Sequence, residues 1–272
     1  DLHRLIRRQR QMCIRDSWIL FKTIFKKEWI NYKRYPFNMI SSIITVYLVF
    51  LVFFLGLKFI AGGTTKFGST TEGLIVGFFI WTYAISAYSS LSWSLMNEAR
   101  AGTLEQLYMC PLGFGWVSIF LIISDFFLSL IFTVPLLFLM MLTTGKFLHL
   151  DVITLFPLIV LTISAGYGIG FISGGLGLIY KKIQAFFQIL QFVFIGFISA
   201  PVDKVPILKI LPFSLGTRLI AENMIGKVPI YRMPLSDLFL LFANAVIYMG
   251  LGMLIFKQCE KIAKKRGLLG HY

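Results

Sequence analysis

Long apolar runs alternate with short polar segments along most of this chain. An apolar helix needs about 20 residues, at a rise of about 1.5 Å each, to cross a bilayer. Six runs come close to that length, at Phe37–Leu57, Gly73–Leu95, Phe114–Leu139, Val152–Ile179, Ile183–Ala200 and Leu235–Phe256. The run from Ile183 is the shortest and stops before Pro201. The pattern predicts an all-α integral membrane protein whose membrane domain, residues 35–256, has six transmembrane helices.

A different pattern precedes the first run. Aromatic residues recur at i, i+3 and i+4 spacing over residues 18–34, with lysines to one side, at Trp18, Phe21, Phe25, Trp29 and Tyr32. This spacing predicts an amphipathic helix that lies in the membrane interface. An ordinary basic juxtamembrane stretch is the alternative. Residues 1–17 are polar and Arg-rich without the apolar core of a signal peptide, so we expect a leader that is disordered or not native.

Two polar segments flank the last run. Residues 201–234 contain several prolines yet remain partly apolar, which predicts one or two short, re-entrant-like helices packed at the membrane surface. Residues 257–272 form a basic tail.

Composition and charge agree with a membrane protein. The 272 residues are 57% hydrophobic and 14% charged, whereas soluble domains average about 45–50% and about 25%. The net charge of +14 does not indicate nucleic-acid binding, because the basic residues lie between apolar runs. With a cytoplasmic N-terminus, eighteen of the 26 lysines and arginines lie on the cytoplasmic side. Without residues 1–17 the ratio is still thirteen to eight, so we expect both termini to be cytoplasmic.

The motifs of soluble enzymes are missing from the sequence. It has no G-x-x-x-x-G-K-[ST], H-E-x-x-H or G-x-S-x-G, and its three histidines lie at polar edges. Cys13, Cys110 and Cys259 are far apart and form no C-x-x-C pair. We therefore expect no catalytic residue, no metal site and no cofactor bound by this chain.

Three glycines are spaced four residues apart in the fourth run. Gly166, Gly170 and Gly174 would share one helix face, where small residues let another helix approach closely. We favour a close helix contact over a flexible hinge, although the two are compatible.

Asp125 falls near the middle of the third run, where an exposed carboxylate would cost roughly 2.5–3.5 kcal/mol. It could be a site for a proton or a cationic substrate. The alternative, which we favour, is a structural carboxyl that a Ser or Tyr on a neighbouring helix hydrogen-bonds.

The loop over residues 96–111 joins the second and third runs on the cytoplasmic side. Gly102 lets the chain turn, and Thr103 with Gln106 has the spacing of a capping box, so a short helix should begin there. Its apolar residues Leu104 and Leu107 share a face, while Glu105 points elsewhere. Such a short helix is unstable alone, which predicts a partner protein.

The string E-A-R-A-G-T-L-E-Q-L-Y-M-C-P-L, from Glu98 to Leu112, closely resembles the cytoplasmic loop of ABC-2 type transporter permeases, the membrane subunits of bacterial and archaeal exporters. Leu215–Glu222 (LGTRLIAE) also resembles the family, and the resemblance extends over the chain from Trp18. It implies that residues 18–34 are a connector helix and that Gly102–Gln106 form a coupling helix, with Glu98 and Arg100 at its edge.

The resemblance further implies a cell-membrane transporter of two permeases, identical or different, and two separate ATPase subunits that bind ATP and Mg. Within the family, G-T-L-E-Q-L is closer to the drug or lipid branch than to polysaccharide exporters. An ATP-independent secondary transporter or channel that uses Asp125 is the alternative. A membrane enzyme ranks third, because no nucleophile or metal cluster is visible.

Overall fold

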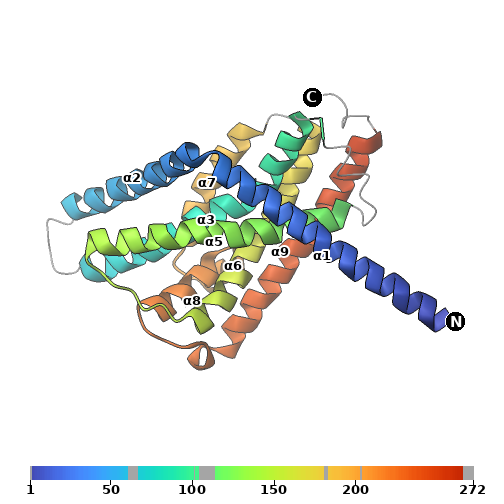
Figure 1. Ribbon diagram of the computed structural model, residues 1–272. Helices are drawn as coiled ribbons and strands as arrows, with labels where there is room; N and C mark the ends of the chain where they lie inside the picture. The colour runs from blue at the N-terminus through green and yellow to red at the C-terminus, as the bar shows by residue number, and fades with distance from the viewer. Residues whose placement is uncertain are drawn as a thin grey trace.

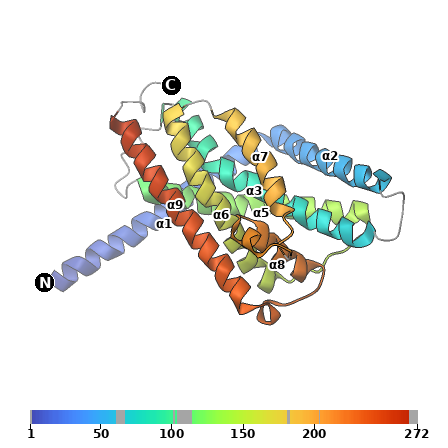
Figure 2. The same cartoon turned by 180° about the vertical axis from the view of Figure 1, so that it is seen from behind.

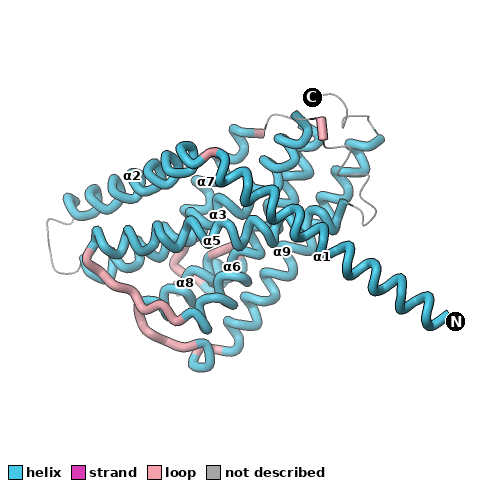
Figure 3. Tube along the Cα trace, in the orientation of Figure 1, coloured by secondary structure: helices cyan, strands magenta, loops and turns pink. Residues whose placement is uncertain are grey.

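The computed structural model describes residues 2–60, 67–100, 102–103, 114–180, 183–202 and 204–265. These residues form helices joined by loops (Figure 3). The α-helices are α1 (Leu2–Arg34), α2 (Pro36–Ile60), α3 (Phe67–Arg100), α5 (Phe114–Thr144), α6 (Val152–Tyr180), α7 (Gln184–Ile198), α8 (Ser214–Met224) and α9 (Leu235–Lys265). Two 3-10 helices, η1 (Pro206–Ile210) and η2 (Ile230–Arg232), lie on either side of α8.

Five of the described helices are long and apolar enough to cross a membrane, namely α2, α3, α5, α6 and α9. They indicate a multi-pass membrane protein, and the expectation of an all-helical fold is confirmed for the described residues. The run that begins at Ile183 gives only α7, whose 15 residues would reach about 22 Å at the usual rise.

α1 covers both the expected interfacial helix and the backbone of residues 2–17. It crosses over α5 in Figure 1, with the N-terminus pointing away from the other helices. Aromatic rings join the two helices: Phe21 lies 5.9 Å from Phe120, and Tyr32 lies 4.7 Å from Phe132, between ring centroids. The aromatic positions of α1 are therefore partly covered by α5.

α3 lies inside the bundle and contacts α5, α6 and α7. Its polar side chains bond to those neighbours. The Tyr83 hydroxyl donates to the Phe126 carbonyl of α5 (2.7 Å), and the Tyr88 hydroxyl donates to the Phe187 carbonyl of α7 (2.8 Å). Such bonds satisfy groups that would be costly to leave unpaired in an apolar setting. α2, by contrast, is almost entirely unburied and stands at the edge of the bundle (Figure 1).

α6 and α9 pack against each other at glycine. A Cβ at Gly252 of α9 would lie 2.1 Å from the Gly168 carbonyl oxygen, and a Cβ at Gly168 would lie 2.4 Å from that of Tyr248. At Gly175 the nearest atom belongs to a side chain, because a Cβ there would lie 2.9 Å from the Cβ of Cys259. The backbones of α6 and α9 therefore approach more closely than any side chain would allow.

The three glycines that the sequence analysis selected lie on a different face of α6, toward α3. A Cβ at Gly170 would lie 2.8 Å from the carbonyl oxygen of Ala87, which is also backbone. Gly166 faces the Phe213 ring at 2.9 Å, and Gly174 faces the Leu91 side chain at 3.3 Å. The helix thus has two close-contact faces, and the contact with α9 was not foreseen.

The segment between α7 and α9 folds back against the beginning of α6 (Figure 2). Its α8 contacts α6, and the His149 amide before α6 donates to the Met224 carbonyl at the end of α8 (2.9 Å). The buried carboxylate of Asp237, at the start of α9, accepts from Lys209 Nζ (2.6 Å) and Arg218 Nη1 (3.2 Å). These ion pairs join η1, α8 and α9.

Candidate functional site

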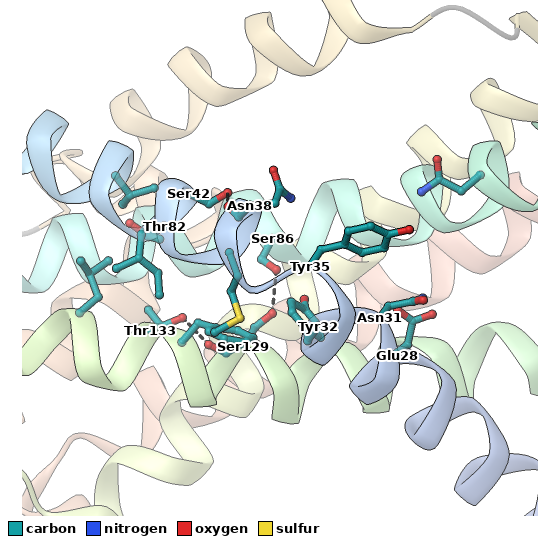
Figure 4. A pocket seen from close by; sticks show the side chains of 16 residues that line it. Glu28, Asn31, Tyr32, Tyr35, Asn38, Ser42, Thr82, Ser86, Ser129 and Thr133 are labelled. Carbon is teal, nitrogen blue, oxygen red and sulfur yellow. Dashed lines mark hydrogen bonds between the residues drawn. The ribbon is translucent and has the colours of Figure 1, made fainter.

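A cavity of about 640 Å³ lies between α1, α2, α3 and α5. Figure 4 shows Glu28 and Asn31 of α1 at one end and Thr82 and Thr133 at the other. This size falls within the range of roughly 300–1,000 Å³ that is usual for ligand pockets. All of the residues that line it lie in the first half of the chain.

The lining of this cavity is mixed. Amides and hydroxyls contribute from each of the four helices, among them Asn38 and the bonded pair Ser86 and Ser129, whose Oγ atoms are 2.7 Å apart. Apolar side chains of α2 and α5, Met39, Ile43, Val46, Phe132 and Leu136, complete the wall. The cavity can therefore accommodate a molecule with both polar and apolar parts.

Two smaller cavities, of about 40 and 280 Å³, share lining residues with the first. All three are lined by Glu28 and Tyr32, and the smaller two also by Asp125 of α5. Burial raises the pKa of Glu28, against the opposing effects of Lys27 and a hydrogen bond with Asn31. Burial, with the nearby charges of Asp125 and Glu28, raises the pKa of Tyr32 to about 12. Tyr32 thus lies near both carboxyl groups.

Asp125 has a partner on α6. The Tyr167 hydroxyl donates to Asp125 Oδ2 at 2.8 Å, which is the type of contact expected of a structural carboxyl. The same side chain also lines the two smaller cavities, as a ligand-binding residue would. The structure is therefore compatible with Asp125 as a structural carboxyl and with Asp125 as part of a binding site.

The charge of this region differs from that of the whole chain. Among the described residues that line the three cavities, the carboxylates are Glu28, Glu98 and Asp125, and the cation is Lys27. Lys27 Nζ is already paired with Glu98 Oε1. A chain of net charge +14 thus surrounds these cavities with an excess of negative charge.

Glu98 also joins α1 to the beginning of the loop that follows α3. Its carboxylate accepts hydrogen bonds from Lys27 and from the Thr103 hydroxyl, and its carbonyl accepts from the Thr103 amide (3.0 Å). Gly102 has a φ of +70°, the left-handed conformation common just after helix ends, and the bond from the Thr103 amide to the Glu98 carbonyl closes the turn. The turn expected at Gly102 is present, and the Thr103 hydroxyl is directed to Glu98.

The other expected coupling residues are distributed as follows. Arg100 is exposed at the end of α3. Leu104, Glu105, Gln106 and Leu107 lie outside the described residues, so their helix remains a prediction. Within the described part of the chain, no three His, Cys, Asp or Glu side chains gather closely enough to hold a metal ion.

Glu28 was missed by the sequence analysis. It sits in the basic stretch Lys26-Lys27-Glu28, where a single acid resembles ordinary surface charge. The available signal was its spacing: Glu28, Asn31 and Tyr32 follow i, i+3 and i+4, so the acid shares a face with a residue of the aromatic set.

Comparison with known proteins adds no family assignment, because neither a protein-family model nor a curated protein sequence matches the chain.

Proposed function

We propose that this chain is the permease subunit of an ATP-driven exporter of the ABC-2 type, in the drug or lipid branch, located in the cell membrane. Two permeases, identical or different, form the substrate pathway. Each is coupled through the loop over residues 98–111 to a separate ATPase, which binds ATP and Mg. The proposal rests on the resemblance of Glu98–Leu112 and Leu215–Glu222 to that family.

The junction at Glu98 is the observation that best supports coupling through this loop. One carboxylate contacts Lys27 of α1 and Thr103 of the loop, and it belongs to α3, which contacts most other helices of the bundle. A displacement of the loop by a partner would therefore act on α1 and α3 together. This is the property that a coupling element needs.

In the proposed topology, α7 completes a sixth crossing, and both termini are cytoplasmic. Its shortness is compatible with this role, because a bilayer can thin locally around a short helix. A reporter fused after Tyr272 and another inserted near Thr70, just before the start of α3 at Phe67, should then be on opposite sides of the membrane. Reporters on the same side would show that the topology is wrong.

The test of the function is ATPase association in the source cell. We expect a basic or hydrogen-bonding group of the ATPase to face Glu105. With a basic group there, Glu105→Lys would place two positive charges together at the contact, which can cost several kcal/mol when water is excluded. The variant should reach the membrane in normal amount but no longer co-purify with an ATPase. The control Glu72→Lys reverses a charge at the other end of α3, where Glu72 pairs with Lys146 at 3.6 Å, and should retain the ATPase.

A secondary transporter or channel is the second candidate, and the position of Asp125 beside two cavities favours it. Transport that continues when no ATPase associates with the unaltered chain would make this candidate the better one.

A further inference from the structure

The cavity between α1, α2, α3 and α5 has a charge and a shape that no part of the export proposal uses. Its α1 end holds Glu28, and Asp125 lies in the adjoining cavities that share Glu28 and Tyr32. Its remaining wall includes the apolar side chains of Met39, Ile43 and Leu136. Acidic and apolar surfaces are thus both within reach of one molecule.

We propose that this cavity, together with the adjoining cavities that share Glu28 and Tyr32, binds an amphipathic organic cation, with its positive charge at Glu28 and Asp125 and its apolar part against Met39, Ile43 and Leu136. The binding needs no ATPase, so it goes beyond the proposed export function and can be measured on this chain alone. Loss of binding would leave the export proposal intact, and loss of ATPase association would leave this one intact.

Charge selects a cation. Lys27 is the cation among the described lining residues and pairs with Glu98, so the carboxylates of Glu28, Glu98 and Asp125 share this one lysine. Two carboxylates in a partly enclosed site disfavour an anion and attract a positive charge, more strongly than they would in water. The rings of Tyr32 and Phe132, 4.7 Å apart, add aromatic surface of the kind that favours organic cations.

Size and lining select an organic ligand over a bare metal ion. A metal ion would need several oxygen ligands at about 2.0–2.6 Å. The volume of about 640 Å³ and the apolar wall are instead suited to a molecule of drug size.

The test is a binding measurement with two dyes that share one ring system. Rhodamine 6G is a cation, and rhodamine B is a zwitterion near neutral pH. Fluorescence anisotropy is measured on the full chain in phosphatidylcholine nanodiscs, with empty nanodiscs subtracted. We expect saturable binding of rhodamine 6G and at least tenfold weaker binding of rhodamine B, because the carboxylates would repel its anionic group.

Variants then locate the site. Glu28→Gln and Asp125→Asn should each raise the Kd of rhodamine 6G about tenfold, which is what the loss of one nearby charge produces. Glu28→Asp keeps the charge and should bind more tightly than Glu28→Gln. The control Glu222→Gln removes a carboxylate that pairs with Arg218 at 3.0 Å, outside the lining of these cavities, and should bind as the unaltered chain does.

Equal affinity for the two dyes would overturn the proposal, because the cavity would then select by size alone, as a lipid-filled gap does. An unchanged Kd in Glu28→Gln would overturn it as well. If Glu28→Gln does not fold, the comparison of the two dyes on the unaltered chain still decides.

Discussion

The contact between α6 and α9 gives the sharpest prediction about stability. Gly252→Ala should destabilise the protein, because the new Cβ would lie 2.1 Å from the Gly168 carbonyl oxygen. Real Cβ atoms essentially never come within 3.0 Å of such an atom, so the helices must separate by roughly 1 Å. Both contacting groups are backbone, so no side chain can rotate away. Overpacking of this kind costs about 1–3 kcal/mol.

Gly250 provides a matched control on the same helix. A Cβ there would meet nothing within 4 Å, so Gly250→Ala creates no overlap. Alanine also has the higher helix propensity, by up to about 1 kcal/mol. Gly250→Ala should therefore leave stability unchanged or raise it, whereas Gly252→Ala should lower it.

The assay is unfolding by SDS in mixed micelles, followed by far-UV circular dichroism, which gives the free energy of unfolding for each variant. The free energy of unfolding of Gly170→Ala should lie between those of Gly252→Ala and Gly174→Ala. The built Cβ of Gly170 lies 2.8 Å from a carbonyl oxygen, whereas the nearest atom to that of Gly174 is a flexible leucine methyl at 3.3 Å. Equal free energies for Gly252→Ala and Gly250→Ala would refute the close approach of the two backbones.

Three acidic residues give further predictions. Asp237→Ala should lower the free energy of unfolding by roughly 3 kcal/mol in the same assay, because Lys209 and Arg218 lose a shared, buried partner. An unchanged free energy of unfolding would show that these ion pairs are not formed. Asp125→Asn should still assemble, whereas Asp125→Leu should give less folded protein by size-exclusion chromatography, because only Asn can still accept the hydrogen bond from Tyr167. Equal yields of folded protein would argue against a structural contact. The hydrogen bond from the Thr154 hydroxyl lowers the pKa of the Asp151 carboxyl below that of a free Asp. The stabilisation by this contact is therefore complete at pH values above the pKa of a free Asp, and it is lost as pH falls through the lowered pKa of Asp151. The protection factor of the amides at the start of α6, which corrects for the slower intrinsic exchange in acid, should therefore fall as pH is lowered. Asp151→Asn should remove that pH dependence of the protection factor.

The sequence predicted the membrane helices well where the signal was local. A long apolar run or an aromatic periodicity is a property of one segment, so five helices long and apolar enough to cross a membrane could be anticipated, as could the part of α1 over residues 18–34. The turn at Gly102 was also predictable, because glycine tolerates the positive φ that the turn requires.

Contacts between segments could not be anticipated in the same way. Spacing placed Gly166, Gly170 and Gly174 on one face, but it could not show which helix that face meets. It also could not show that Gly168 faces Gly252, because the two residues belong to helices far apart in the sequence. A carboxylate becomes part of a site only when other helices enclose it, and for that reason Glu28 was missed.

The central claim is that this chain couples ATP hydrolysis by a partner ATPase to transport across the membrane. The most direct test is the rate of ATP hydrolysis by the co-purified ATPase in liposomes, measured with and without this chain. We predict a higher rate when the chain is present, and a return to the rate of the ATPase alone when the chain carries Glu105→Lys. A rate that is the same with and without the chain would contradict the claim.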